Sequence, residues 1–301
     1  MTGSGTEERT GAHVLEALRA LIGSSGLVLV VSDFDGTLSP IVRDPLGARI
    51  VPAARAALRR LARIAEARPE RLAVVVLSGR AALDVAGRVR VGGVSYHGNH
   101  GIERGDLPRR ARPERLEVVA EAALEPYVER AHALGIGVAR RLGHPGWLFV
   151  EDKGPTVAFH FRQAPDADRA RAAVLEAIEA VETEVGDHGL VAFEGRKVVE
   201  FRPIGAGGKG AAVERLIADA GPAAVLMMGD DRSDAEGFVA VRRARESGRL
   251  RGLAVAVHGA AETPPEVFAT ADLELPHPVA AARLLTSLSG LLEREGSAGR
   301  G

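Results

Sequence analysis

The segment 27–32, with the sequence LVLVVS, is an apolar run of strand length, and two carboxylates follow it at Asp33 and Asp35. An uninterrupted run of this kind is typical of a strand that is buried on both faces, as in a parallel sheet. Residues i and i+2 of an extended chain point to the same side, so the two carboxylates can face one site. Gly36 allows the chain to turn away directly afterwards. The run therefore predicts a core strand that ends at a pair of carboxylates.

The first and last thirds of the chain alternate between apolar runs of strand length and segments with helical periodicity. This order predicts a Rossmann-like α/β core, in which helices cover both faces of a parallel sheet. The expected helices are 13–23, 52–67, 209–220, 234–245 and 278–293, and the expected further strands are 72–77, 94–97, 223–228, 253–257 and 271–275.

The middle third has a different order of elements, namely a helix, two strands, a second helix and two more strands. This order predicts a separate α+β layer with an antiparallel sheet. We expect residues 1–104 and 204–301 to form the core and residues 105–203 to form an inserted cap domain. The expected cap helices are 115–134 and 166–185, and the expected strands are 147–152, 156–162, 190–194 and 197–202.

Composition excludes several classes of function. The 301 residues carry a formal net charge of −1, which gives no basic field for nucleic acid or for an anionic membrane. No apolar run approaches the roughly 20 residues that span a bilayer, and the N-terminus lacks the pattern of a signal peptide. The chain has no cysteine, so disulfides, thiolate zinc sites and cysteine nucleophiles are excluded. We expect a cytoplasmic protein, and a monomer is the hypothesis for its assembly.

Polar residues follow four of the expected core segments. Ser78 follows the strand 72–77, Lys209 follows four residues rich in glycine, and Asp230 and Asp231 follow the strand 223–228. Any one of them alone is typical of turn chemistry or of a helix start. Together with the carboxylates at 33 and 35, they are expected at one edge of one sheet, where α/β proteins bind ligands. Such a set predicts a ligand site at this edge.

The chemistry that suits this set is phosphoryl transfer. Three carboxylates bind a hard cation, for which Mg²⁺ is our prediction, and Lys209 offsets the charge of the transferring group. Ser78 can donate a hydrogen bond to that group, Asp33 can attack phosphorus, and Asp35 can transfer the proton.

Lysine is rare in this chain. Only three of the 39 basic residues are lysine, at positions 153, 197 and 209. A lysine that persists against such an arginine bias can be needed for its compact, mobile ammonium group. The motifs described next include Lys153 and Lys209, whereas we expect Lys197 to occupy a solvated strand position.

The motifs of the chain resemble, in order, those of the haloacid dehalogenase (HAD) superfamily and, within it, of the trehalose-6-phosphate phosphatases. The resemblance extends from about residue 27 to residue 290 and includes Lys209. Its other motifs are DFDGTLSP at 33–40, SGR at 78–80, GNHGIE at 98–103, EDKG at 151–154, EFRP at 200–203 and GDDRSD at 229–234.

The resemblance implies a role for each matching residue of the core. Asp33 is then the nucleophile that forms an aspartyl-phosphate, and Asp35 is the general acid and base. Ser78 and Lys209 bind the phosphate. The Mg²⁺ ligands are Asp33, Asp35 through its carbonyl group, and Asp230, with Asp231 supporting the site.

The resemblance also implies a substrate and a pocket for it. The substrate is then trehalose 6-phosphate, which is hydrolysed to trehalose and phosphate. Arg80 and His100 lie on the core side of the sugar pocket. Glu151, Lys153 and Glu200 on the cap bind the glucose hydroxyl groups.

Three alternatives remain at this point. The first is a HAD phosphatase for another sugar phosphate, such as sucrose-phosphate, mannosylglycerate-phosphate or glucosylglycerate-phosphate. The second is a sugar-phosphate sensor without catalysis, although Asp33, Asp35, Lys209 and Asp230 are all present. The third is a dinucleotide-binding protein, because residues 205–210 fit the pattern G-x-G-x-x-G between a strand and a helix.

Overall fold

The computed structural model describes residues 4–23, 25–42, 44–185, 189–195, 197–259 and 263–298. The chain forms two compact units: Met1–Val119 together with Gly208–Gly301, and Ala120–Gly207. The helices of the first unit are α1 (Ser4–Ile22), α2 (Pro52–Ala67), α3 (Ala82–Val89), α6 (Lys209–Ala220), α7 (Arg232–Glu246), α8 (Pro265–Thr270) and α9 (Pro278–Ala298). Its strands are β1 (Val28–Ser32), β2 (Leu72–Leu77), β3 (Val94–Gly98), β4 (Glu103–Leu107), β10 (Ala224–Gly229), β11 (Arg251–Val257) and β12 (Leu273–Leu275).

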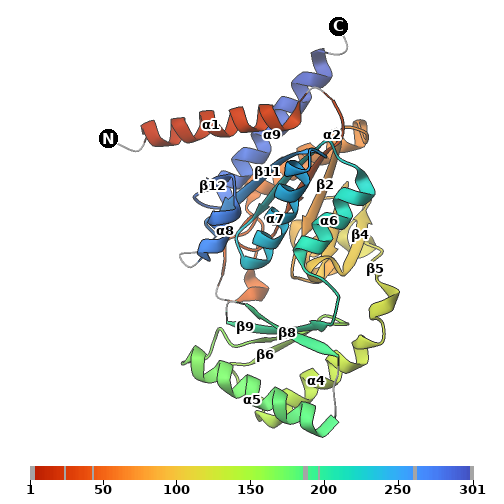
Figure 1. Ribbon diagram of the computed structural model, residues 1–301, viewed down its shortest axis with the longest axis vertical. Coiled ribbons are helices and arrows are strands. Elements are labelled where there is room, and N and C mark those ends of the chain that lie inside the picture. The colour runs from red at the N-terminus through yellow and green to blue at the C-terminus, as the bar shows by residue number, and fades with distance from the viewer. Residues whose placement is uncertain are drawn as a thin grey trace. The chain divides into compact units, whose positions relative to one another are not determined.

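The first unit is built on one large sheet with the strand order β12-β11-β10-β1-β2-β3-β4-β5, where β5 is Val119–Ala120. The pairs from β12 to β3 are all parallel, and β4 pairs antiparallel with β3. Figure 1 shows α6 and α7 in front of this sheet. The parallel sheet predicted from the apolar runs is therefore present.

The side chains of β1 alternate between two apolar cores, one on each face of the sheet. Val28 and Val30 pack in the core that contains residues of α1, α2, α3 and α9. Leu29 and Val31 pack in the core that contains residues of α6 and α7. Because both faces are covered, every side chain of β1 is apolar except that of its last residue, Ser32.

The register of the central strands brings their carboxyl ends to the same edge. Ser32 at the end of β1 lies opposite Met228 of β10 and Val76 of β2. Asp33, Ser78 and Asp230 follow these strands within two residues, so all three lie at one edge of the sheet. β1 lies between β2 and β10, where the strand order reverses direction, and ligands of open α/β sheets bind at such a point.

The second unit contains a four-stranded antiparallel sheet with the order β6-β7-β9-β8. Its helices α4 and α5 cover one face of that sheet and share an apolar core with it (Figure 1). The other face carries polar side chains, among them Glu151 and Glu200. The elements are α4 (Tyr127–Arg141), β6 (Phe149–Asp152), β7 (Val157–His160), α5 (Ala167–Val185), β8 (Leu190–Gly195) and β9 (Val198–Pro203).

The helix predicted over 115–134 is wrong. The chain there has a short β5 and two single-turn helices, Pro113–Arg115 and Ala122–Leu124, and α4 begins only at Tyr127. Pro126 is the reason, because a proline inside a helix lacks the N–H donor and clashes with the preceding turn.

The boundary between the units also differs from the one expected at 104/105. β4 pairs with β3, and β5 is the neighbour of β4 in the same sheet, so the first unit extends to Val119. In the part of the chain that the structure describes, no helix is both long enough and apolar enough to cross a membrane.

Arg71 joins three separate parts of the first unit. Its side chain is 9% exposed and forms an ion pair with Glu295 of α9, with 3.0 Å between Nη2 and Oε2. The same guanidinium donates to the backbone carbonyl groups of Ile22, Gly23 and Gly26. The carbonyl groups at the end of a helix have no partner within that helix, so Arg71 satisfies acceptors that α1 leaves open.

We predict that Arg71→Ala destabilises the first unit by about 2–4 kcal/mol, because the partly buried carbonyl groups of Gly23 and Gly26 and the partly buried carboxylate of Glu295 lose this donor. Denaturant unfolding followed by circular dichroism measures the loss. Arg59→Ala, which removes an exposed arginine of α2, is the control and should change the midpoint little. Equal stabilities of the two variants would contradict the anchoring role of Arg71.

Candidate functional site

Asp33 and Lys209 form a buried ion pair at the edge of the large sheet. Asp33 directly follows β1, and its N–H donates to the carbonyl group of Met228 in β10. Lys209 is the first residue of α6, and its Nζ lies 2.6 Å from Asp33 Oδ1. The side chains of Lys209 and Asp33 are 1% and 6% exposed. Water screens such a pair weakly, so each charge depends strongly on the other.

Asp234 is the second buried partner of Lys209. Its Oδ1 lies 2.8 Å from Lys209 Nζ, and its Oδ2 accepts from the N–H groups of Asp230 and Asp231. Asp231 is the N-cap of α7, where its Oδ1 accepts from the N–H of Asp234 and from the hydroxyl of Ser233. This reciprocal capping box fixes the start of α7 against the end of β10.

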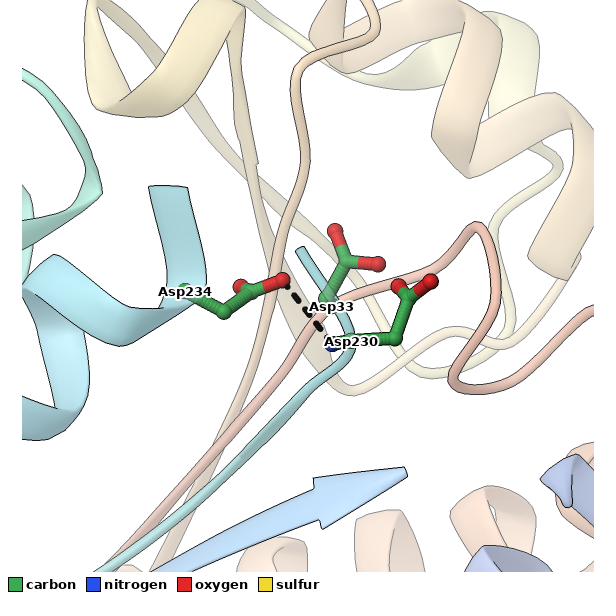
Figure 2. Close-up of side chains that lie close together, drawn as sticks. All are labelled: Asp33, Asp230 and Asp234. Atoms are coloured by element: carbon green, nitrogen blue, oxygen red, sulfur yellow. Dashed lines mark hydrogen bonds between the residues drawn. The ribbon is translucent and has the colours of Figure 1, made fainter. Parts of the chain in front are cut away.

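Three carboxylates gather beside this lysine. Asp33, Asp230 and Asp234 are all buried and offer oxygen atoms within 4.8 Å of one another. Figure 2 shows that they come from the end of β1, the end of β10 and the start of α7. A cluster of carboxylate oxygens is the ligand set of a hard divalent cation.

Two glycines leave the space that the carboxylate of Asp230 occupies in this cluster. A Cβ at Gly36, which has φ +77°, would lie 2.0 Å from Oδ2 of Asp230. A Cβ at Gly259, in the loop after β11, would lie 2.5 Å from the same atom. The Asp230 carboxylate is therefore held between two backbone segments that only glycine allows.

The electrostatics of the cluster favour a bound cation. Burial raises the pKa of Asp33 to about 7, although Lys209 acts in the opposite direction. Burial, reinforced by the neighbouring carboxylates, also raises the pKa values of Asp230 and Asp234 well above the ordinary range. One ammonium group does not offset three buried carboxylates, and a divalent cation would supply the missing positive charge. The residues present therefore fit a metal ion.

Asp35 is held by Arg80 rather than by this cluster. Arg80 Nε and Nη2 donate to the two carboxylate oxygens of Asp35 at 2.6 and 2.9 Å, which is a bidentate pair. Its Nη1 donates to Asp84 of α3 at 3.2 Å. The N–H of Arg80 donates to the hydroxyl of Ser78, which is 1% exposed.

His100 lies close to the same edge. It is buried, has φ +58°, and its backbone N–H donates to the carbonyl group of Ser78. A Cβ at Gly79 would lie 2.7 Å from His100 Nε2, so the imidazole packs directly on that backbone. Ser78, Arg80 and His100 therefore belong to one local structure in the first unit.

The second unit has its own buried ionic cluster on the polar face of its sheet. Lys153 Nζ lies 3.1 Å from Oε1 of Glu200, and Arg202 Nη2 lies 2.7 Å from Oε2. Glu151 lies beside them, with its Oε2 3.8 Å from Lys153 Nζ and 2.8 Å from His160 Nε2. The three predicted cap residues thus lie together.

Sequence reasoning overlooked three residues of these clusters. The first is Asp234, which belongs to the acidic cluster. The side chain of Asp231 caps α7 and that of Asp35 pairs with Arg80, and the metal roles predicted for Asp231 and for the carbonyl group of Asp35 stay predictions. The spacing D-x-x-D at 231–234 marks a helix start and was the available signal for Asp234. The other two are His160, which contacts Glu151 on the neighbouring strand, and Arg202, which contacts Glu200 on its own strand. Strand alternation alone does not identify such partners.

Comparison with known proteins gives consistent matches. The family model for trehalose-phosphatases matches residues 31–265. A trehalose-phosphate phosphatase of Mycobacterium avium (strain 104) is 35% identical over 300 residues, which are 96% of this chain and 70% of the relative. One of Mycobacterium bovis (strain BCG) is 35% identical over 242 residues, which are 77% of this chain. The chain spans 57% of that relative's length.

Solved structures with related names share the fold. The C-terminal domain of a Candida albicans trehalose-6-phosphate phosphatase matches with a TM-score of 0.69 at 21% identity. The match covers 93% of this chain and 97% of that domain. A trehalose-6-phosphate phosphatase related protein has a TM-score of 0.66 at 18% identity, covering 89% of this chain and 99% of that one. These likenesses confirm the predicted fold class.

We predict that Lys209→Met destabilises the protein by about 3–5 kcal/mol without added metal, because three buried carboxylates lose their counter-charge. Added Mg²⁺ should then raise the melting temperature of the variant more than that of the wild type. Thermal unfolding with and without Mg²⁺ measures both effects. Lys197→Met, at an exposed lysine, is the control. A variant that gains no more from Mg²⁺ than the wild type would contradict a cation site here.

Proposed function

Because this chain belongs to the trehalose-phosphatase family, we propose that it is an enzyme that hydrolyses trehalose 6-phosphate to trehalose and phosphate. The observation that carries this proposal is the buried Asp33, which contacts Lys209 and shares a carboxylate cluster with Asp230 and Asp234. A carboxylate with a neighbouring ammonium group and a cation site suits attack on a phosphate ester.

The proposed reaction has two displacement steps. In the first, an Asp33 oxygen bonds to phosphorus and the bond from phosphorus to the sugar oxygen breaks, while Asp35 gives that oxygen its proton. In the second, Asp35 takes a proton from water, the water oxygen bonds to phosphorus, and the bond to Asp33 breaks. Phosphate leaves, Asp33 is again a carboxylate, and Asp35 is again the protonated acid with which the first step began.

Mg²⁺ is the cofactor that we propose for the acidic cluster. Asp33, Asp230 and Asp234 would hold it through side-chain oxygens, while the carbonyl group of Asp35 stays the predicted further ligand and Asp231 stays the predicted supporting residue. When bound, it supplies positive charge next to the phosphate oxygens. Lys209 and Ser78 bind the same group in this proposal, and Arg80 orients Asp35 through its bidentate pair.

We assign recognition of the sugar to the cluster of the second unit. Glu151 and Glu200 would accept from hydroxyl groups, because a carboxylate accepts two hydroxyl donors through charge-assisted hydrogen bonds, and Lys153 would donate to a hydroxyl oxygen. Arg80 and His100 would contribute from the first unit, as the resemblance of their motifs implies.

The alternatives are weaker for specific reasons. The G-x-G-x-x-G segment follows β9, which pairs with β7 and β8 in the antiparallel sheet and so does not form a βαβ unit. A sensor without catalysis has no need of a complete set of Asp33, Asp35, Lys209 and Asp230. Another sugar phosphate remains the main competing substrate. A cytoplasmic location, a monomeric state and the absence of nucleic acid partners stay predictions.

We predict that the protein with Mg²⁺ releases phosphate from trehalose 6-phosphate faster than from other sugar phosphates. A colorimetric phosphate assay over a panel measures this, with the sucrose, mannosylglycerate and glucosylglycerate phosphates included. Asp33→Asn is the control, and it should lose turnover by at least about 10³-fold while circular dichroism stays unchanged. Preference for another sugar phosphate would refute the substrate, and an active Asp33→Asn variant would refute the nucleophile.

We also predict that Glu151→Ala impairs hydrolysis of the sugar phosphate far more than hydrolysis of p-nitrophenyl phosphate. The reason is that the small ester has no hydroxyl groups for Glu151 to bind. The ratio of kcat/KM for the two substrates measures the effect, and a drop of about tenfold or more is expected. Glu184→Ala on α5, which removes an exposed partner of Arg141, is the control. Equal losses on both substrates would show that Glu151 does not select the sugar.

A further inference from the structure

Glu200 is a buried carboxylate whose two oxygen atoms have different cationic partners. Its side chain is 8% exposed, with Lys153 Nζ 3.1 Å from Oε1 and Arg202 Nη2 2.7 Å from Oε2. Lys153 comes from the turn between β6 and β7, whereas Arg202 stands two residues further along the same strand as Glu200. Two residues along a strand return to the same face, so Arg202 reaches Glu200 without leaving that face.

The guanidinium group of Arg202 lies over an aromatic ring. Its Cζ lies 4.6 Å from the centroid of the Phe193 ring. Phe193 stands on β8 directly opposite Glu200 in the strand register, so the ring and the carboxylate are cross-strand neighbours. The guanidinium therefore lies on the ring and reaches the carboxylate at the same time.

This arrangement restricts the side chain of Arg202. The side chain is 7% exposed, and its buried Nε has no hydrogen-bond acceptor among the residues that the structure describes. The face of an aromatic ring attracts a guanidinium, most strongly where water is excluded. The Phe193 ring thus stabilises a guanidinium that is otherwise incompletely paired, and fixes its plane relative to Glu200.

We propose that Phe193 and Arg202 are positioning residues that give the enzyme its selectivity for the sugar by fixing the orientation of Glu200. This inference rests on the proposed function, in which Glu200 binds substrate hydroxyl groups. A carboxylate with a fixed plane directs its lone pairs at defined points, so only hydroxyl groups at those points bind well. Neither Phe193 nor Arg202 has to contact the substrate.

Arg202 and Lys153 contribute differently to the orientation of Glu200. Lys153 supplies a point charge with rotatable donors, whereas Arg202 supplies a planar group that the ring holds in place. Arg202→Lys keeps the charge but loses both the planar fork and its stacking. We therefore expect Arg202→Lys to resemble Arg202→Met more than the wild type.

The test compares the best sugar phosphate of the wild type with p-nitrophenyl phosphate. Arg202→Met and Arg202→Lys should raise KM for the sugar phosphate by about tenfold, which corresponds to the loss of one charge-assisted hydrogen bond. Phe193→Leu should raise it by a smaller factor, whereas Phe193→Trp keeps a ring and should stay close to the wild type. The kcat/KM for p-nitrophenyl phosphate should change less than about twofold in all of them.

The control is Val128→Ala. Val128 stands on α4, which covers the other face of the same sheet, and it is 37% exposed, close to the 38% of Phe193. The change removes exposed apolar area from the same unit at a distance in the fold from Arg202 and Glu200. It should leave KM for the sugar phosphate unchanged.

A second measurement separates positioning from general damage to the sheet. In a Glu200→Ala background, Phe193→Leu and Arg202→Met should raise KM no further, because the group that they position is absent. A merely structural role predicts that the losses add. The Phe193→Leu series decides the question even where Arg202→Met lowers the yield of folded protein.

Several outcomes would overturn the inference. It fails if p-nitrophenyl phosphate hydrolysis falls as much as sugar phosphate hydrolysis, if KM for the sugar phosphate is unchanged, or if the losses persist in the Glu200→Ala background. A wild type that prefers a sugar phosphate other than trehalose 6-phosphate would refute the proposed substrate alone, since the same comparison then uses the preferred one. A wild type that does not favour any sugar phosphate over the small ester would refute both.

Discussion

The rest of the first unit's site depends on the ion pairs that the ammonium group of Lys209 forms. It joins Asp33, which is 176 residues away in the sequence, to Asp234 at the start of α7. The two carboxylates hold the pKa of Lys209 well above its ordinary value, although burial acts against this. The end of β1, the start of α6 and the start of α7 are therefore held together by one charge. Without it, three carboxylates would face each other with little water to screen them.

In the proposed function, the two units would divide the chemistry in a way that follows from their architecture. A parallel sheet brings the carboxyl ends of its strands to one edge, so charged residues from distant segments can converge there, and helix starts at that edge supply N–H groups. An antiparallel sheet with helices on one face leaves its other face for polar side chains in cross-strand rows. The first arrangement suits a compact, highly charged reacting group. The second suits a broad ligand with many hydroxyl groups.

Much of the fold was predictable because its signals are local. The helices at 52–67 and 209–220 and the strand at 72–77 were predicted at the residues where α2, α6 and β2 lie, since each has a clear period and a clear boundary residue. The helix over 115–134 was wrong because periodicity was given more weight than Pro126. β4 was missed because its residues, Glu103–Leu107, are mostly polar, and only pairing with β3 makes them a strand.

The sequence by itself determined which residues end the core strands and which motifs the chain carries, because strand-length apolar runs and the residues after them are adjacent along the chain. It placed Asp33, Ser78, Lys209 and Asp230 at one edge. Only the tertiary structure decided what each charge contacts: Asp234 joins the acidic cluster, Arg80 holds Asp35, and Phe193 supports Arg202 beside Glu200. Such partners depend on side-chain direction and burial across strands, and neither is encoded in the spacing of residues along the chain.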